Sequence, residues 1–191
     1  GDISIDDKII HTGDTNTAIR FPSADTIQFE TSGTDRLKIS STGVISAPLS
    51  GSLCLGNQSS RVIDWAHTLQ VEGTDETSSI SIMRNSNDVN PPYLTFCKSR
   101  GSVVGGTTIV QNNDLIANIQ FKAADGNAGE STAAQITAEV DATPGDQDMP
   151  GRLVFKTTPD GSAAAVERLR INSVGKVGIN STAPDGMLAI E

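Results

Sequence analysis

The residue types that most often carry catalysis are sparse in this sequence. Its two histidines, His11 and His67, lie in different parts of the chain with no metal-ligand spacing between them. Zinc and triad chemistry therefore have little support. The sequence contains no G-x-S-x-G motif and no P-loop, and the stretch Gly105-Gly106-Thr107-Thr108 lacks the lysine of a phosphate cradle. We expect no catalytic, cofactor-binding or metal-binding residues and no enzyme activity.

Two acidic stretches are candidate sites for a cation or for acid–base chemistry. Residues 125–130 (Asp125-Gly126-Asn127-Ala128-Gly129-Glu130) resemble a fragment of a calcium loop but lack the twelve-residue pattern, so a polar hairpin turn is the simpler interpretation. The stretch from Asp141 to Asp148 contains three acids near Pro144-Gly145, and a solvated loop is a simpler interpretation than a metal site. A glycosidase would need two of these carboxylates about 5–10 Å apart, which sequence spacing alone cannot place.

Trp65, Cys54 and Cys97 have both functional and structural interpretations. Trp65 is the single tryptophan, and it could stack on a sugar or pack at a junction between modules, of which we favour packing. The two cysteines have no C-x-x-C spacing and form no dense disulfide framework. We expect two partly buried thiols, compatible with folding in a reducing cytoplasm.

Charge and composition exclude several function classes. A formal net charge of −9 without a basic stripe argues against nucleic-acid binding. No apolar run approaches the roughly 20 residues of a membrane span. Ile and Val far outnumber Leu, which favours strands, while aromatic residues make up only 4% of the chain. Because so few large side chains build a thin core, we expect burial between chains.

The chain repeats itself. Asp35-Arg36-Leu37-Lys38-Ile39 matches Glu167-Arg168-Leu169-Arg170-Ile171, and a glycine follows four residues after each isoleucine, at Gly43 and Gly175. Each copy predicts a β-meander with a tight glycine turn. In addition, Leu69-Gln70-Val71-Glu72 recurs as Leu188-Ala189-Ile190-Glu191. Such self-similarity is typical of modular repeat proteins, and we expect the chain to be a piece of a longer one.

These patterns predict an all-β chain in four parts. Residues 1–50 form a shaft-like segment of short strands, 51–68 a linker or junction, 69–187 a β-sandwich-like module, and 188–191 the start of a next module. The sandwich-like module contains nine candidate strands: Leu69–Val71, Ser79–Met83, Tyr93–Cys97, Thr107–Val110, Leu115–Phe121, Ala134–Val140, Arg152–Thr157, Val166–Ile171 and Lys176–Ile179. Alternation places Leu169 on a buried face, and we expect Arg36 and Arg168 to form ion pairs along the exterior or between chains.

Several motifs resemble repeats of bacteriophage tail-fibre proteins, of the kind that often carry a C-terminal intramolecular chaperone. The resemblance covers most of residues 69–191 and, more loosely, 11–45. Its motifs are Lys98-Ser99-Arg100-Gly101, Asp114 to Phe121 followed by Asp125-Gly126, Asp148-Met149-Pro150-Gly151-Arg152-Leu153-Val154-Phe155-Lys156-Thr157-Thr158, Asp160-Gly161-Ser162, Glu167 to Ile171 and Gly175 to Ile179.

The resemblance implies a β-prism-like, intertwined homotrimer on a virion, assembled in the host cytoplasm. Its expected partners are other copies of itself, other virion tail proteins and a glycan or protein receptor on the host surface. Two alternatives remain open at this point: a tailspike-type polysaccharide depolymerase, and a head fibre or capsid decoration protein.

Overall fold

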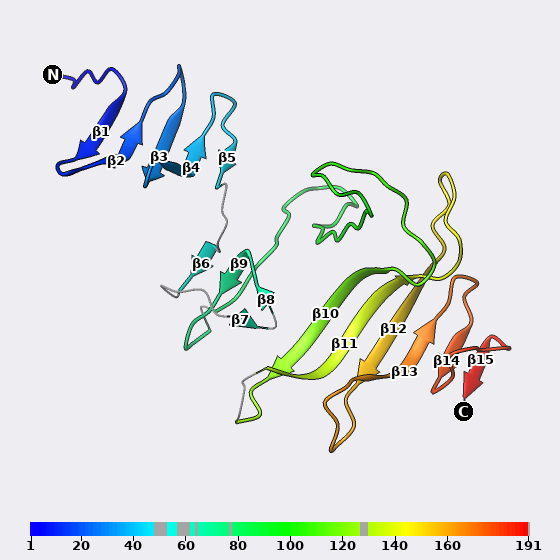
Figure 1. Cartoon of the computed structure of the whole chain (residues 1–191). Helices are drawn as coiled ribbons and strands as arrows, with labels where there is room; N and C mark the ends of the chain where they lie inside the picture. The colour runs from blue at the N-terminus through cyan, green and yellow to red at the C-terminus, as the bar shows by residue number, and fades with distance from the viewer. Residues whose placement is uncertain (48–52, 57–61, 64, 77, 127–129, 191) are drawn as a thin grey trace. The chain divides into compact units, whose positions relative to one another are not determined.

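The protein is all-β and divides into two compact units, residues 1–81 and 82–191 (Figure 1). The computed structural model describes residues 1–47, 53–56, 62–63, 65–76, 78–126 and 130–190. These residues contain strands, turns and irregular segments and no helix. The all-β prediction is therefore confirmed, while the four domain boundaries drawn from composition stay predictions.

The first unit begins with a five-stranded antiparallel meander in which each strand pairs with the next along the chain. Short polar turns separate the strands, so neighbours in sequence are also neighbours in the sheet. The strands are β1 (Lys8–His11), β2 (Asp14–Arg20), β3 (Ile27–Thr31), β4 (Thr34–Ile39) and β5 (Ile45–Ser46).

Four short strands follow in the same unit. β6 (Leu53–Leu55) pairs in parallel with β9 (Leu69–Val71), and β7 (Val62–Ile63) pairs with β8 (Trp65–Ala66). Trp65 thus lies in a two-stranded pair, although its side chain falls outside the described part of the structure. Part of the predicted linker or junction also falls outside it, at residues 51–52, 57–61 and 64.

The second unit is built on one six-stranded sheet whose order again follows the chain (Figure 1). The first five strands are antiparallel, and the last pairs in parallel with its neighbour. The strands are β10 (Leu115–Ala123), β11 (Ser131–Val140), β12 (Gly151–Thr157), β13 (Val166–Ile171), β14 (Val177–Ile179) and β15 (Leu188–Ile190).

The internal repeat is reproduced in three dimensions. Phe29 lies opposite Leu37 as Phe155 lies opposite Leu169, and each pair is followed by a bulge that leaves one arginine without a cross-strand partner. The glycine turns also match, because Gly43 and Gly175 adopt φ values of 77° and 80°. These positive values favour glycine, as the sequence predicted.

The second repeat, of residues 69–72 at 188–191, also corresponds to a repeated structure, a parallel strand pair. Leu69–Val71 pairs in parallel with Leu53–Leu55, and Leu188–Ile190 pairs in parallel with Val177–Ile179. Residues 188–190, expected to open a next module, are here the last strand of the sheet.

Three predicted strands are wrong: Ser79–Met83, Tyr93–Cys97 and Thr107–Val110 lie in irregular segments. Their alternating apolar residues are typical of strands, but a strand also needs a neighbouring strand for its backbone groups, and the described residues form no strand pair with these segments. The missing strands also change the expected β-sandwich-like arrangement of this module. Among the described residues of unit 2 there is one main sheet, where a sandwich would have two.

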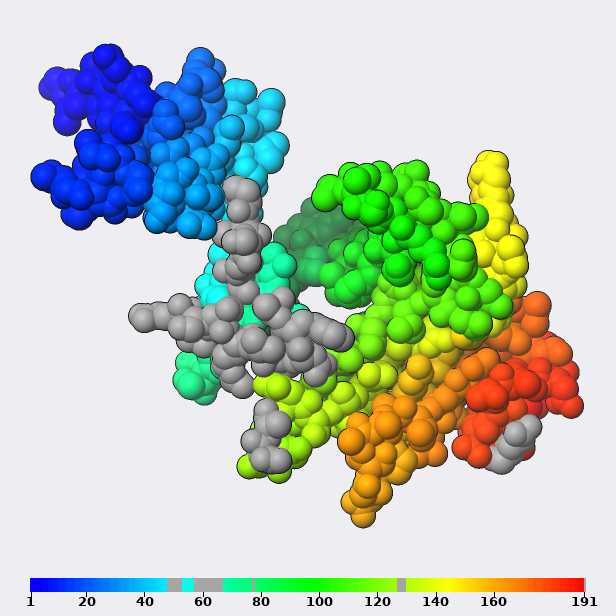
Figure 2. All heavy atoms as spheres, in the orientation of Figure 1, coloured from blue at the N-terminus to red at the C-terminus, as the bar shows by residue number. Residues whose placement is uncertain are grey.

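The core inside a single chain is small, as the composition indicated. Of the hydrophobic residues that the structure describes, four are buried: Ala18, Val110, Val140 and Val154. Figure 2 shows the irregular residues near 85–110, drawn in green, lying apart from the strand-rich orange and red surface of unit 2.

Candidate functional site

The main surface feature of unit 2 is a continuous row of apolar side chains that crosses the sheet. The strand registers place these residues opposite one another in turn: Ile119, Ile136, Phe155, Leu169, Ile179 and Ile190. A second row on the same face, two residues away on each strand, contains Leu153, Ile171, Val177 and Leu188. We call these two rows the unit 2 apolar face.

The unit 2 apolar face is only partly covered within the chain. Ile119 is 43% exposed, Ile171 41% and Ile190 68%, while Phe155 and Leu169 are half-buried. Monomeric proteins rarely leave a contiguous apolar patch of this kind in water. The face is therefore a candidate interaction surface.

The meander of unit 1 has an equivalent surface, which we call the unit 1 apolar face. Ile9, Ile19, Phe29 and Leu37 lie opposite one another across four strands. Their exposed fractions are 50%, 36%, 37% and 36%. Each sheet thus has one apolar side that its own chain leaves open.

The opposite side of the unit 2 sheet is closed by charged side chains. Arg152 Nη2 lies 2.6 Å from Glu139 Oε2 and its Nη1 lies 3.1 Å from Asp141 Oδ1. Lys156 Nζ lies 3.2 Å from the other oxygen of Glu139. On this same side Val154 and Thr137, a cross-strand pair, are 0% and 1% exposed. Two of the three fully buried side chains of the sheet therefore lie on its charged side, while the third, Val140, has the parity of the apolar side.

Hydrogen bonding fixes the protonation of this charged network. Burial alone would raise the pKa of Glu139, but hydrogen bonds from Thr137, Arg152 and Lys156 outweigh it, so the pKa lies below the ordinary glutamate value. Burial opposes ionisation of Asp141 too, and hydrogen bonds from Ser173 and Arg152 lower its pKa. Both groups are carboxylates at neutral pH.

The polar side of the unit 1 meander follows the same plan. Arg20 bonds to Asp7 at 3.0 Å and to Glu30 at 3.1 Å. Gln28, which is 7% exposed, donates to Glu30 at 2.7 Å. Both sheets are thus amphipathic, with satisfied polar groups on one side and uncovered apolar groups on the other.

The total exposed area supports an unfinished interior. The chain exposes 13939 Å². Two separate compact domains, each of half its 19.9 kDa mass, would together expose about 10,400 Å². The chain therefore exposes more area than two compact domains of its mass would.

The structure does not bring the sequence-predicted candidates together into a chemical site. His11 lies at the end of β1 and His67 between β8 and β9, both exposed. No group of three or more His, Cys, Asp or Glu within the described ranges could hold a metal ion. Asp125 accepts a hydrogen bond from Ser131 Oγ at 2.7 Å, and residues 127–129 of that loop lie outside the described part.

The loop of residues 141–150 is a connection between β11 and β12 with its own hydrogen bonds. Asp141 accepts from the backbone N–H of Ser173 at 2.8 Å, and Gly145 and Asp148 form an isolated bridge. This loop projects beyond the ends of the two strands (Figure 1). Its acids therefore take structural roles or face solvent.

The two thiols and the two repeat arginines differ in part from expectation. Cys54 is half-buried and free, whereas Cys97, expected to be partly buried, is free and exposed. Arg36 donates from Nε to Thr31 Oγ1 at 2.7 Å, and Arg168 donates likewise to Thr157 Oγ1 at 3.1 Å. Within one chain each bulge arginine thus bonds to a threonine hydroxyl instead of the expected carboxylate.

Sequence reasoning missed the Glu139, Arg152 and Lys156 cluster. These residues are distant in sequence and meet only because β11 pairs with β12, which places Glu139 opposite Arg152. Knowledge of the hairpin register would have found them. Among the described residues, no helix has the length and apolarity of a membrane span.

Comparison with known proteins gives structural similarity alone. No protein-family model and no curated protein matches the sequence. Among solved structures, the carboxy-terminal domain of the bacteriophage T5 L-shaped tail fibre is similar, with a TM-score of 0.50 and 14% identity over 90% of this chain and 75% of that one. A second structure, of that domain with its intramolecular chaperone domain, has a TM-score of 0.47 and 12% identity over 90% of this chain and 52% of that one. The chain therefore has a fold of the phage tail-fibre type.

Proposed function

We propose that this chain is a structural and adhesive segment of a phage tail fibre, which acts as a homotrimer in attachment of the virion to the host cell. Its partners are two further copies of itself, neighbouring tail proteins, and a glycan or protein on the host surface. Assembly takes place in the host cytoplasm, before the particle is released. The tail-fibre type of fold supports this role.

The observation that carries the proposal is the pair of uncovered apolar faces. Three copies related by a threefold axis would turn these faces inward and their charged sides outward. Burial of apolar area would then supply the core that one chain lacks. The acidic exterior, with a net charge of −9 per chain, keeps finished fibres from associating side by side.

The carboxyl groups favour this structural role over polysaccharide cleavage. A glycosidase acid needs a raised pKa so that it can hold a proton at working pH. Asp88, Asp114, Glu139 and Asp141 all have a lowered pKa, because each accepts hydrogen bonds that favour the charged form. None of these four carboxyls fits the proton-donating acid of a depolymerase.

The test of assembly is the mass of the purified protein in solution. Light scattering or sedimentation should give three times 19.9 kDa at micromolar concentration. Leu169→Asp, on the unit 2 apolar face, should dissociate the assembly, while Val174→Asp, at a turn position that is 70% exposed, should not. A stable wild-type monomer would contradict the proposal.

The test of attachment is competition. Trimeric protein added to host cells should slow adsorption of the parent phage, and the same protein carrying Leu169→Asp should not. If trimeric protein has no effect at saturating concentration, the segment spaces the fibre and does not bind the receptor.

A further inference from the structure

Residues 82–99, which we call the arm, have almost no hydrogen bonds from their backbone to other parts of the described chain. None of the backbone–backbone hydrogen bonds recorded among the described residues involves this stretch. Figure 1 draws it as an irregular trace between β9 and β10. Backbone N–H and C=O groups that are not bonded to protein must be bonded to water, so a dry environment for the arm requires a partner strand.

The arm is nevertheless strongly apolar. Its large hydrophobic side chains are all exposed: Ile82 (50%), Met83 (76%), Val89 (98%), Tyr93 (68%), Leu94 (69%) and Phe96 (49%). Such exposure is costly in water, at roughly 25 cal/mol for each Å² of apolar surface. The arm therefore combines open hydrogen-bonding groups with open apolar groups.

The arm has a preformed turn. Asp88 accepts hydrogen bonds from Ser86 Oγ at 2.7 Å and from the backbone N–H of Asn90 at 2.8 Å, and its carboxylate also pairs with Arg84. These bonds lower the pKa of Asp88, the backbone bond from Asn90 contributing most. The turn is held by side chains, so the segments on either side of it keep their backbone groups available.

The outer edge of β10 is the matching open surface. The backbone of Leu115–Phe121, as far as the structure describes its bonds, pairs with β11 only. Leu115 and Phe121 on this strand are 47% and 51% exposed. An open apolar edge is a template for another strand unless something covers it, and between the irregularities at Leu115/Ala117 and Phe121/Lys122 the register of β10 is regular. The nine residues of β10 can accommodate the seven of Tyr93–Ser99.

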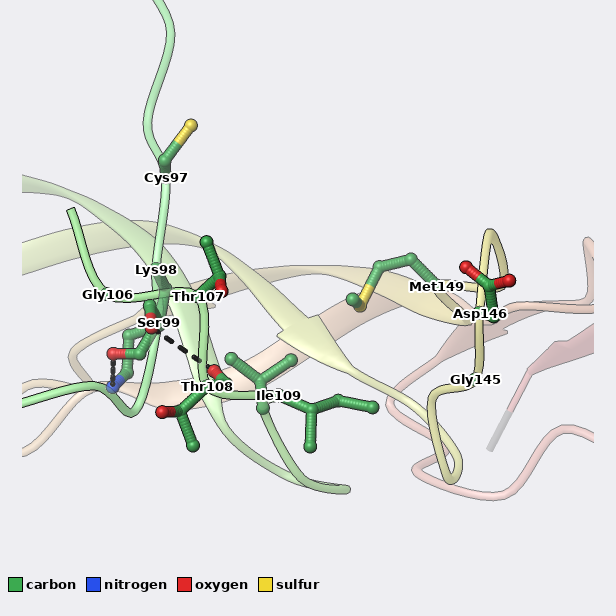
Figure 3. A pocket seen from close by; sticks show the side chains of 11 residues that line it. Cys97, Lys98, Ser99, Gly106, Thr107, Thr108, Ile109, Gly145, Asp146 and Met149 are labelled. Carbon is green, nitrogen blue, oxygen red and sulfur yellow. Dashed lines mark hydrogen bonds between the residues drawn. The ribbon is translucent and has the colours of Figure 1, made fainter.

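The base of the arm borders a hollow of about 770 Å³. Cys97 and Ser99 lie on one side of it, Ile109 follows along the next segment, and Met149 lies across from them (Figure 3). Ser99 Oγ donates to the carbonyl of Thr108 at 3.2 Å and closes one end. The hollow has room for side chains that this chain does not provide.

Charge indicates which molecule covers the arm. The arm contains the cations Arg84 and Lys98 and the single acid Asp88, whereas the whole chain has a net charge of −9. The arm is thus a basic segment of an acidic protein, complementary to the rest of another copy. A second copy also carries the open β10 edge, which makes it a partner with both features.

We infer that the arm is exchanged between copies: residues Tyr93–Ser99 of one chain hydrogen-bond to the outer edge of β10 of a second chain. This inference rests on the proposed trimer and specifies the strand pairing within it. The exchange closes the β10 edge and gives the arm its missing backbone partner.

Hydrogen exchange on the assembled protein tests the pairing without any variant. The amides of Leu94 and Phe96 or those of Thr95 and Cys97 should exchange at least 100-fold more slowly than the same amides in unfolded protein. All amides of Leu115–Phe121 should be slow as well. If the protein is trimeric by mass but the arm exchanges at the unfolded rate and alternate β10 amides are fast, the exchange is wrong and the trimer stands. A monomeric mass would remove both.

Proline substitution provides the second test, with the mass of the assembly as the readout. Leu94→Pro and Thr95→Pro remove amides that point to opposite sides of the arm, so at least one should reduce the trimer fraction at least tenfold at micromolar concentration. Neither costs a backbone hydrogen bond within the chain. If neither changes the trimer fraction, the arm is not exchanged.

Val104→Pro is the matched control. Val104 precedes Gly105, whose φ is 80°, in a turn closed by the hydrogen bond from Gly106 N to Val103 O. Proline is favoured at this turn position. The control should keep the wild-type trimer fraction, and a loss equal to that of the arm variants would overturn the inference.

Discussion

Arg168 donates a hydrogen bond from Nε to Oγ1 of Thr157 at 3.1 Å, across the bulge between β12 and β13. In unit 1 Arg36 makes the same bond to Thr31 at 2.7 Å, across the bulge between β3 and β4. The two loops before these arginines differ in length, yet the bulge, the bond and the following glycine turn recur. A bulge re-aims one side chain, and here it turns the arginine back along the neighbouring strand.

The first prediction follows from that bond. Arg168→Ala should destabilise the protein by about 0.5–1.5 kcal/mol, the usual contribution of a hydrogen bond, because the residue is exposed and its partner hydroxyl can bond to water. Thermal denaturation should show a similar small shift for Arg36→Ala. The trimer should remain in both variants. Loss of the trimer would instead place Arg168 in an interface between chains.

The repeated meander could be predicted from the sequence because every signal for it is local. Alternation in Glu167 to Ile171, a turn glycine four residues later and a matching earlier copy were enough to identify β13, β14 and the turn between them. The alternation of apolar and charged residues also predicted that Leu169 lies on the apolar face, where it pairs with Phe155. The bond of Arg168 was not, because it depends on a bulge that no residue type specifies.

The second prediction concerns Leu169, which is half-buried in one chain. If three copies cover the unit 2 apolar face, Leu169→Ala should cost roughly 2–5 kcal/mol, the range for a fully buried leucine. Denaturant titration of the assembled protein measures it. Val174→Ala, 70% exposed at the adjacent turn, serves as the control and should change little. Equal stability of the Leu169 variant would mean that this face stays in water.

The third prediction is an acid limit set by Glu139 and Asp141. Their pKa values are lower in the folded protein than in the unfolded chain, so folding is favoured while both are ionised. This stability is fully present above the unfolded values, about pH 4–5, and is lost as pH falls through the lower folded values. The urea midpoint should be flat from pH 8 to about pH 5 and should decrease below that.

Glu139→Gln provides the specific variant for the acid limit. It should flatten the decrease below pH 5, because the amide has no charge to lose. It should also lower stability at pH 7, where Lys156 loses its anionic partner and Arg152 loses one of its two. Asp160→Asn, in an exposed turn, is the control and should leave the pH profile unchanged. An identical profile for wild type and Glu139→Gln would show that other carboxyls set the limit.

The three predicted strands that the structure lacks show what could not be predicted from the sequence. Tyr93–Cys97 and Thr107–Val110 have strand-like alternation and β-branched or aromatic residues, yet neither pairs as a strand in the described part of the chain. The one backbone–backbone hydrogen bond that Thr107–Val110 makes to the described residues is from Arg100 N to Thr108 O. Apolar alternation indicates that a segment prefers the strand conformation, whereas strand pairing depends on which other segment lies beside it. The same limit applies to the apolar faces, since alternation locates an apolar side without saying which molecule covers it.

The fourth prediction tests the crossover that joins β14 to β15. A Cβ on Gly178 would lie 2.3 Å from the backbone oxygen of Ser181, so Gly178→Ala forces the turn to move. We expect a loss of about 1–3 kcal/mol, the usual cost of overpacking. Gly186→Ala, in the same connection, would place its Cβ 3.7 Å from the nearest atom and should be tolerated. Unit 1 has a similar close contact at Gly56, directly after β6, where a Cβ would lie 2.1 Å from the carbonyl oxygen of Glu72 at a φ of 88°. Thermal denaturation should therefore show that Gly56→Ala is at least as harmful as Gly178→Ala. If Gly178→Ala is as stable as Gly186→Ala, the backbone contact between residues 178 and 181 does not hold the parallel strand in place.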